Sequence, residues 1–278
     1  MPSQLFENKK SAVTFPEVFT RQVQVCSVWL REGIYNPYTA YRTILSQFCE
    51  DIKIPVNRLD MDKTVLLSLE GGSAFERDLS RLYSIKNDGI SSVMLSWNND
   101  NSLAGGAHGI SGLTKKGIDT IRIMNELCMA LDVSHLNDKS FYAAIDRADA
   151  VLASHSNARA ICFHKRNLTD DALRLIRDKK GIVGINFYPT FLGNGDVFEN
   201  IYLHIEHMLD LGLGNSVAIG SDLDGADMDE RLRETKDIAK LYDFLSERIG
   251  DSDICDKIFF KNAYNFYEKL FDKQSNML

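Results

Sequence analysis

Short apolar runs recur along the chain, and longer amphipathic segments separate them. The runs show little alternation of polar and apolar positions, which is typical of parallel strands that are buried on both faces. The runs that predict strands are residues 23–30, 64–70, 90–97, 129–135, 150–155, 181–187 and 216–222. Their recurrence predicts an α/β fold that is built from repeated strand and helix units.

The segments between these runs have helical periodicity. Several of them begin with Asp, Asn or Thr and end with Gly or a basic residue, as the ends of helices commonly do. The predicted helices are residues 78–89, 114–129, 138–149, 169–181 and 200–212. Composition does not change sharply along the chain, so residues 1–278 are expected to form a single domain.

The number of predicted strands leaves two architectures open. A βα barrel requires eight strands, whereas a doubly wound open sheet accepts seven. The residues at the carboxyl ends of the strands are more informative, because the loops at that edge build the active site of a βα barrel. Polar or aromatic residues end most of the runs, namely Glu70, Trp97, Asn98, His135, His155, Asn186 and Asp222.

Composition and charge narrow the class of ligand. The chain is 44% apolar and 26% charged, which is ordinary for a globular protein, and its formal net charge is -7 with no cluster of Lys or Arg. This charge argues against nucleic acid or an anionic membrane as the main partner and favours a small ligand. No apolar stretch is long enough to span a bilayer or to form a signal-peptide core, so the protein is expected to be cytoplasmic.

Two similar heptapeptides carry histidine. LDVSHLN covers residues 131–137 and VLASHSN covers residues 151–157, so His135 and His155 lie one strand-helix-strand step apart. Either histidine alone is more easily interpreted as a satisfied core or surface residue. Together with Glu70 in the LEGG motif they favour a metal site, because imidazole and carboxylate are common zinc ligands and three of them leave a position open for water.

The remaining histidines lie in other contexts. His204 and His207 are three residues apart in a predicted helix and are expected to face solvent. His108 and His164 lie in predicted loops, and only His108 is considered for contact with substrate. None of these four is predicted to be a metal ligand.

Six motifs in succession resemble the membrane dipeptidase (renal dipeptidase) family of zinc metallopeptidases. The resemblance covers nearly the whole chain and implies a (β/α)8 TIM barrel of the metal-dependent hydrolase type, which holds two zinc ions and cleaves dipeptides. The motifs that carry it are LLSLEGG, VMLSWNNDNSLAGGAHGISGLTKKG, MALDVSH, LASHSNARAICFHKRNLTDD, GIVGINFY and AIGSDLDG.

The resemblance also implies roles for individual residues. Glu70 would bridge both metals, and His135 and His155 would hold one of them. Arg166 would bind the carboxylate of the substrate, which a guanidinium can grip through paired hydrogen bonds. Asp222 would contact the substrate amino group or the metal-bound water, and as a catalytic residue it would pass a proton from water to the departing amine.

Two features depart from the family pattern. Members carry a His-x-Asp pair on a first strand, which holds the second metal, but this chain has no histidine before His108. The segment MPSQLFENKK resembles the sequence that follows this motif, so the barrel is expected to lack its first strand and to hold one zinc ion. Trp97 stands where mammalian members have histidine, and it joins Tyr188 of the GIVGINFY motif and Asp222 as an expected substrate-binding residue.

The sequence therefore predicts a metal-dependent dipeptidase that is impaired at one metal site. Two alternatives stay open: a non-catalytic protein that binds a peptide or an amino acid at a residual metal site, and another metal hydrolase of the amidohydrolase type. An unclosed barrel would expose strand edges that a second copy of the chain could cover, so a homo-oligomer is possible.

Overall fold

The computed structural model describes residues 14–275, so the segment MPSQLFENKK lies outside the described residues. All seven predicted strands are confirmed, with ends that differ from the predicted ones by a few residues. They are β1 (Gln22–Trp29), β2 (Lys63–Glu70), β3 (Ile90–Met94), β4 (Ala130–Asp132), β5 (Val151–Ala153), β6 (Ile182–Ile185) and β7 (Val217–Ile219).

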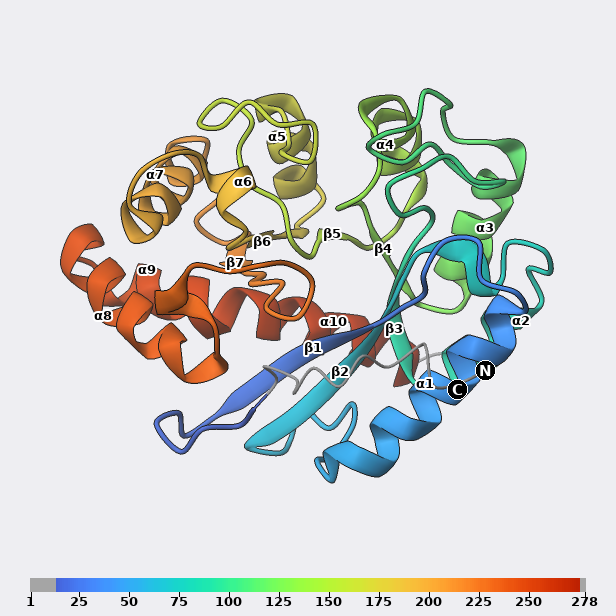
Figure 1. Cartoon of the computed structure of the whole chain (residues 1–278), viewed down its shortest axis with the longest axis horizontal. Helices are drawn as coiled ribbons and strands as arrows, with labels where there is room; N and C mark the ends of the chain where they lie inside the picture. The colour runs from blue at the N-terminus through green and yellow to red at the C-terminus, as the bar shows by residue number, and fades with distance from the viewer. Residues whose placement is uncertain (1–13, 276–278) are drawn as a thin grey trace.

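The strands form one parallel sheet in the order of the chain, from β1 to β7. The sheet curls into a half-barrel, and most of the helices lie on its outside (Figure 1). Among residues 14–275 no ladder joins β1 to β7, so the described strands do not close the ring. The expected TIM-barrel type of fold is confirmed in this form, which places every strand's carboxyl end at one edge.

Helices connect the strands, and the five predicted helices are all present. Side chains cap the first turns of three of them. The side chains of Thr114, Asn137 and Thr169 each accept a hydrogen bond from a backbone N–H of the following turn. The helices that follow β1 to β5 are α1 (Pro37–Ile52), α2 (Arg81–Asn87), α3 (Lys115–Glu126), α4 (Asp138–Ala144) and α5 (Asp170–Asp178).

The last third of the described chain is mainly helical. It contains α6 (Pro189–Leu192), α7 (Val197–Asp210), α8 (Ile238–Ile249), α9 (Ser252–Asp256) and α10 (Asn262–Ser275). A π-helical turn, η6 (Lys257–Lys261), joins α9 to α10, and short 3-10 turns are η2 (Gly72–Ala74), η3 (Ile145–Arg147), η4 (Glu230–Leu232) and η5 (Thr235–Asp237).

The two faces of the sheet bury different sets of residues. Along β2, Val65, Leu67 and Leu69 belong to the large core under the helices, whereas Leu66 belongs to a smaller apolar layer inside the curl. Because side chains alternate along a strand, Glu70 shares the inner face with Leu66. Both faces are apolar, which explains why the sequence shows continuous apolar runs.

Helix α10 completes the inner layer. Its Tyr267 and Leu270 pack against inward residues of five strands, which are Leu66, Ala130, Leu152, Ile182 and Ala218. In Figure 1 the helix crosses behind the strands. The side chain of Asn262, at its first turn, donates hydrogen bonds to the carbonyl oxygens of Gly214 and Val217 and so attaches α10 to β7.

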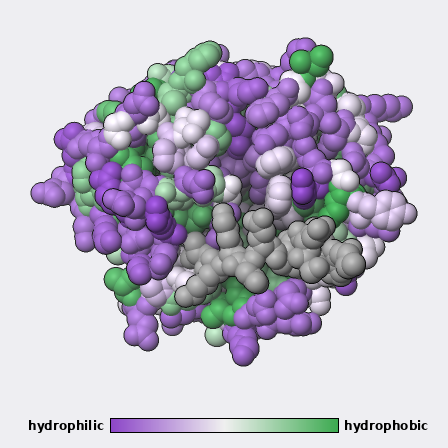
Figure 2. Space-filling model, in the orientation of Figure 1, coloured by the Kyte–Doolittle hydropathy of each residue, from purple (hydrophilic) through white to green (hydrophobic). Residues whose placement is uncertain are grey.

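Burial of the apolar side chains in the two layers leaves a mainly polar surface. The face shown in Figure 2 is mainly hydrophilic, with hydrophobic residues in small groups. Within residues 14–275 no helix combines the length and the apolar character that crossing a membrane requires. Within residues 14–275 no disulfide joins any of the five cysteines.

Candidate metal centre

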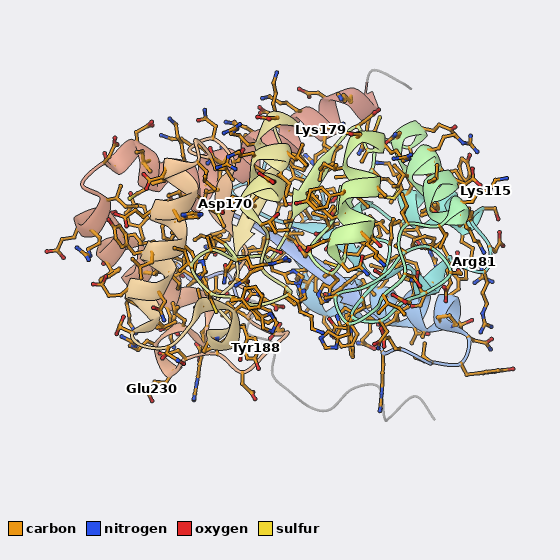
Figure 3. All side chains as sticks on the ribbon, turned by 90° about the horizontal axis from the view of Figure 1, so that it is seen from above. Arg81, Lys115, Asp170, Lys179, Tyr188 and Glu230 are labelled. Carbon is orange, nitrogen blue, oxygen red and sulfur yellow. The ribbon has the colours of Figure 1, made fainter. Side chains whose placement is uncertain are left out.

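Strand alternation brings three candidate ligands to one edge of the sheet. Glu70 is the last residue of β2. His135 lies three residues after the end of β4, and His155 lies two residues after the end of β5. The direction of the strands can be followed in Figure 3, where Lys179, just before β6, and Tyr188, just after it, lie toward opposite sides of the molecule. The candidate ligands therefore lie on the same side as Tyr188.

The ligand atoms of Glu70, His135 and His155 converge. They all lie within 4.8 Å of one another, with 2.9 Å between the two Nε2 atoms and 3.2 Å between Nε2 of His135 and Oε1 of Glu70. Both histidines are buried. The structure thus brings the three residues that the sequence predicts into one cluster, and the set of two imidazoles and a carboxylate fits a divalent cation such as zinc.

The orientation of His135 is fixed from outside the cluster. Its Nδ1 lies 3.0 Å from Oδ1 of Asn98, and because an amide oxygen only accepts, Nδ1 carries the proton and Nε2 is left as a lone pair. The indole Nε1–H of Trp97 donates to Oε1 of Glu70 at 2.9 Å, and its ring stacks on His135 with centroids 5.8 Å apart. Trp97 and Asn98 therefore hold two of the three ligands in place.

Burial keeps both histidines neutral. It lowers the pKa of His135 and of His155 well below the usual range, and the nearby charge of Arg166 lowers both further. Neutral imidazole is the form that binds a metal. The cluster is therefore in the protonation state that a cation requires.

Arg166 extends into the same region. Its side chain is buried, its Nε donates to the carbonyl oxygen of Ser134 at 2.9 Å, and its guanidinium lies over the ring of Phe191. Burial lowers its pKa to about 10, while the charges of Glu70 and Asp222 counteract this effect. One terminal nitrogen, Nη2, has no hydrogen-bond partner among residues 14–275, which is the arrangement that an anionic ligand would satisfy.

Asp222 lies just after β7, in a left-handed backbone conformation with φ of 59°. Its Oδ2 accepts a hydrogen bond from Nδ2 of Asn186 at 3.1 Å. Burial raises its pKa from 3.8 to about 7, and the charge of Glu70 raises it further, whereas Asn186 and Arg166 lower it and Asp224 adds a small increase. A carboxyl group with a pKa near 7 can accept and release a proton at neutral pH.

The pKa of Asp222 has a consequence for stability. The folded state binds this proton more tightly than the unfolded chain does, so stability should fall as the pH rises from about 4 to about 7 and stay reduced above that. In metal-free protein, Asp222→Asn should therefore be more stable than the unmutated chain at pH 8, by on the order of 4 kcal/mol, with the gain shrinking toward pH 4. Urea unfolding over this pH range measures the difference.

The matched control for this experiment is Asp227→Asn, because Asp227 is an exposed carboxylate in the same loop. Its stability should follow that of the unmutated chain at every pH. If Asp222→Asn and the unmutated protein lose stability in parallel as the pH rises, Asp222 does not hold a proton in the folded state.

Tyr188 and Asn186 share the loop after β6. The backbone N–H of Tyr188 donates to Oδ1 of Asn186, and its ring packs against Phe191 with centroids 5.0 Å apart. The side chain of Asn157 exchanges two hydrogen bonds with the backbone of Asn186, which ties the loop after β5 to the loop after β6. The hydrogen bond from Asn186 to Asp222 extends this connection to the loop after β7, so Arg166, Tyr188 and Asp222 lie on adjoining loops.

The prediction for His204 is wrong. Its side chain is fully buried, with Nδ1 accepting from the backbone N–H of Ala158 and Nε2 donating to the carbonyl oxygen of Leu192. Burial lowers its pKa to about 4. His207 is partly exposed and pairs with Asp170 at 2.8 Å, so only the second of the two histidines lies at the surface.

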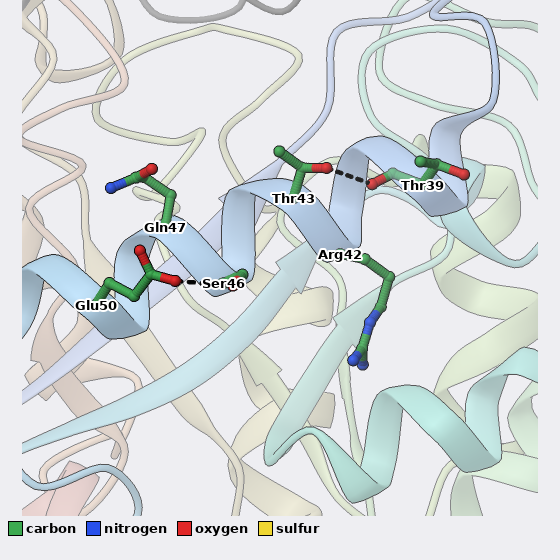
Figure 4. Close-up of a pocket in the computed structure, with 6 residues that line it drawn as sticks. All are labelled: Thr39, Arg42, Thr43, Ser46, Gln47 and Glu50. Carbon is green, nitrogen blue, oxygen red and sulfur yellow. Dashed lines mark hydrogen bonds between the residues drawn. The ribbon is translucent and has the colours of Figure 1, made fainter.

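A further hollow runs along the exposed side of α1 and is lined by Thr39, Arg42, Thr43, Ser46, Gln47 and Glu50 (Figure 4). Its polar groups are engaged locally, because Thr43 donates to the carbonyl oxygen of Thr39 and Ser46 donates to Glu50. Arg42 pairs with Asp88. None of the candidate site residues lines this hollow.

A curled parallel sheet with a Glu–His–His cluster at its carboxyl edge defines a class, the barrel-type metal-dependent hydrolases that include dipeptidases. Within that class the chain belongs to the membrane dipeptidase family, peptidase family M19, whose family model matches residues 36–275. The resemblance read from the motifs is thereby confirmed.

Individual relatives agree with this placement. The chain is 35% identical to an uncharacterised protein in the pqqA 5′ region of Klebsiella pneumoniae, over 74% of this chain and 83% of that protein. It spans 60% and 58% of the length of two further curated relatives, from Acinetobacter calcoaceticus and Schizosaccharomyces pombe, and the second of these is described as an uncharacterised dipeptidase.

Two solved structures extend the comparison. One is a metallopeptidase described as dipeptidase AC, with 26% identity, a TM-score of 0.72 and coverage of 88% of this chain and 71% of that one. The other is a metallopeptidase from Rhodobacter sphaeroides that is bound to a phosphinate mimic of the dipeptide L-Ala-D-Ala. It has 26% identity, a TM-score of 0.71 and coverage of 88% and 68%.

Proposed function

We propose that this protein hydrolyses dipeptides with the help of one zinc ion that Glu70, His135 and His155 bind. The observation that carries the proposal is the convergence of their ligand atoms within 4.8 Å at the carboxyl edge of the sheet. Three protein ligands are the number that catalytic zinc sites commonly use, because a further position must stay open for water. Glu70, His135 and His155 form the one cluster of potential metal ligands found among residues 14–275, so the proposal counts a single ion.

The ion would lower the pKa of a bound water and polarise the carbonyl group of the substrate. The protein's own residues do the rest. Glu70, His135 and His155 hold the site rigidly, since Trp97 and Asn98 fix two of their side chains. This rigidity keeps the ligands in position without reorganisation during the reaction.

Arg166 would bind the substrate carboxylate through the nitrogen that lacks a partner among the described residues. Asp222, with a pKa of about 7, would take a proton from water and pass it to the departing amine. Trp97 and Tyr188 would line the space beside the substrate. The dipeptide mimic bound to the Rhodobacter sphaeroides relative supports a substrate of this size.

The test combines metal analysis with an assay for dipeptide hydrolysis. The protein should bind close to one zinc ion per chain in equilibrium dialysis and should hydrolyse a panel of free dipeptides, with activity lost on chelation and recovered when zinc is returned. One bound ion without hydrolysis of any dipeptide would instead indicate a non-catalytic binding protein. Hydrolysis confined to lactones, cyclic amides or N-acyl amino acids would indicate another reaction of the amidohydrolase type.

A further inference from the structure

The duplicated Ser-His sequence has a structural counterpart that the metal site alone does not explain. Ser134 and Ser154, which precede the two histidines, lie on neighbouring strand ends with 3.2 Å between their hydroxyl oxygens. The hydroxyl of Ser154 is also 2.8 Å from Nδ1 of His155. On the other side, the hydroxyl of Ser134 donates to Oδ1 of Asp132 at 2.8 Å.

Asp132 is a fully buried carboxyl group that accepts at one oxygen. Its Oδ1 receives the backbone N–H groups of Ser134 and Ser154, each at 3.1 Å, in addition to the Ser134 hydroxyl. Backbone N–H groups only donate, so this oxygen must act as an acceptor. The one hydroxyl proton of Ser134 is therefore directed to Asp132.

The direction of the remaining bonds follows step by step. The Ser134 oxygen already accepts from the backbone N–H of His155 at 3.1 Å, and its own proton goes to Asp132. It can take part in the contact with Ser154 only as an acceptor, so Ser154 donates to it. The Ser154 oxygen then has a lone pair for His155, and Nδ1 of His155 must carry the proton.

We infer that Asp132, Ser134 and Ser154 form a relay of hydrogen bonds that places the proton of neutral His155 on Nδ1 and leaves its Nε2 free to bind a metal. The reversed direction would leave the two hydroxyl oxygens in contact with no hydrogen between them. The inferred direction brings the lone pairs on Nε2 of His135 and of His155 to within 2.9 Å of each other, which is an arrangement that a cation between them would satisfy. The relay does for His155 what Asn98 does for His135, because each accepts a hydrogen bond from Nδ1 of its histidine. Each histidine ligand therefore has its own orienting group. The three relay residues are positioning residues, because they act on the metal through His155.

The relay rests on the proposed metal site for its purpose but can be tested without metal. In metal-free protein labelled with ¹⁵N-histidine, two-bond ¹⁵N–¹H correlation spectra distinguish a proton on Nδ1 from one on Nε2. The signals of His155 are identified by their loss in His155→Gln. The unmutated protein should carry the proton on Nδ1, and Ser154→Ala should shift it toward Nε2.

The second measurement is zinc affinity, by competition with a chelating dye. Ser154→Ala should lower the affinity by roughly 10- to 100-fold, as loss of an outer partner of a metal ligand typically does. Ser154→Thr keeps a hydroxyl and should restore both the tautomer and the affinity. The matched control is Ser156→Ala, because Ser156 is a buried serine in the same loop whose hydroxyl has no partner among the described residues.

The outcomes separate the two proposals. A proton on Nε2 of His155 in the unmutated protein, or equal effects of the Ser154 and Ser156 substitutions on affinity, would overturn the relay. Failure of the unmutated protein to bind zinc would overturn the proposed function, while the tautomer of His155 would still test the relay. Because the spectrum of the unmutated protein is decisive alone, a variant that fails to fold does not remove the test.

Discussion

Replacing His155 with alanine should abolish tight binding of a divalent cation. The cluster would keep only Glu70 and His135, and two protein ligands do not hold zinc as firmly as three. The loss should exceed the roughly 10- to 100-fold that removing an outer partner of a ligand costs. Equilibrium dialysis followed by elemental analysis measures the bound metal.

The control for His155→Ala is His207→Ala. His207 is a partly exposed histidine on α7 that pairs with Asp170, so its removal takes away an imidazole without touching the cluster. Metal content should stay at the level of the unmutated protein. Equal metal content in His155→Ala and the unmutated protein would refute the assignment of the ligands.

Exchange of Arg166 for lysine should weaken substrate binding even though the positive charge is kept. A guanidinium grips a carboxylate through two parallel hydrogen bonds, and a lysine ammonium cannot reproduce this fork. Hydrogen bonds to charged groups contribute about 1.5–3 kcal/mol, so KM for a free dipeptide should rise roughly 10- to 100-fold. Steady-state kinetics over a range of dipeptide concentrations measures this change.

The substrate supplies the complementary test. A dipeptide amidated at its C-terminus lacks the carboxylate, so the unmutated protein should bind it about as poorly as Arg166→Lys binds the free acid. In Arg166→Lys the difference between the two substrates should shrink, as expected for two partners of one interaction. Arg159→Lys is the matched control, because Arg159 lies in the same loop but pairs with Asp138. Equal binding of both substrates by the unmutated protein would remove Arg166 from the site.

Much of the fold could be predicted because local patterns determine it. The apolar runs identified all seven strands, since a strand buried on both faces tolerates few polar residues. The starts of helices α3 and α5 were predicted at Thr114 and Thr169, and that of α4 at Asp138, because a cap acts within one turn of itself. Information of this kind lies within a few neighbouring residues.

The prediction for His204 failed although a signal was available. His204 lies on the same stripe of α7 as Ile201, Ile205 and Met208, which are all buried, so helical periodicity points inward. A prediction from its polarity alone places His204 at the surface, whereas its position on the helix places it in the core. What the sequence could not reveal is that the backbone N–H of Ala158, in the loop after β5, and the carbonyl oxygen of Leu192, at the end of α6, satisfy both ring nitrogens.

The ligands of the candidate site could be predicted from the sequence, but the groups that orient them could not. Glu70, His135 and His155 could be found because they end apolar runs and because the motifs resemble a known family. Their orienting partners could not, since Asn98 and Asp132 act through contacts between different strand ends. The only trace of the relay in the sequence is the duplicated serine before each histidine.

The packing of α10 inside the curl also sets an order of events for a nascent chain. Leu66 is made early, yet the layer that contains it is complete only when Tyr267 and Leu270 are present. A ribosome must therefore release almost all of the described chain before the inner layer can close, and such long-range closure slows folding. Until then the inner apolar surface of the strands stays exposed, and exposed apolar surface of this kind favours aggregation of the emerging chain.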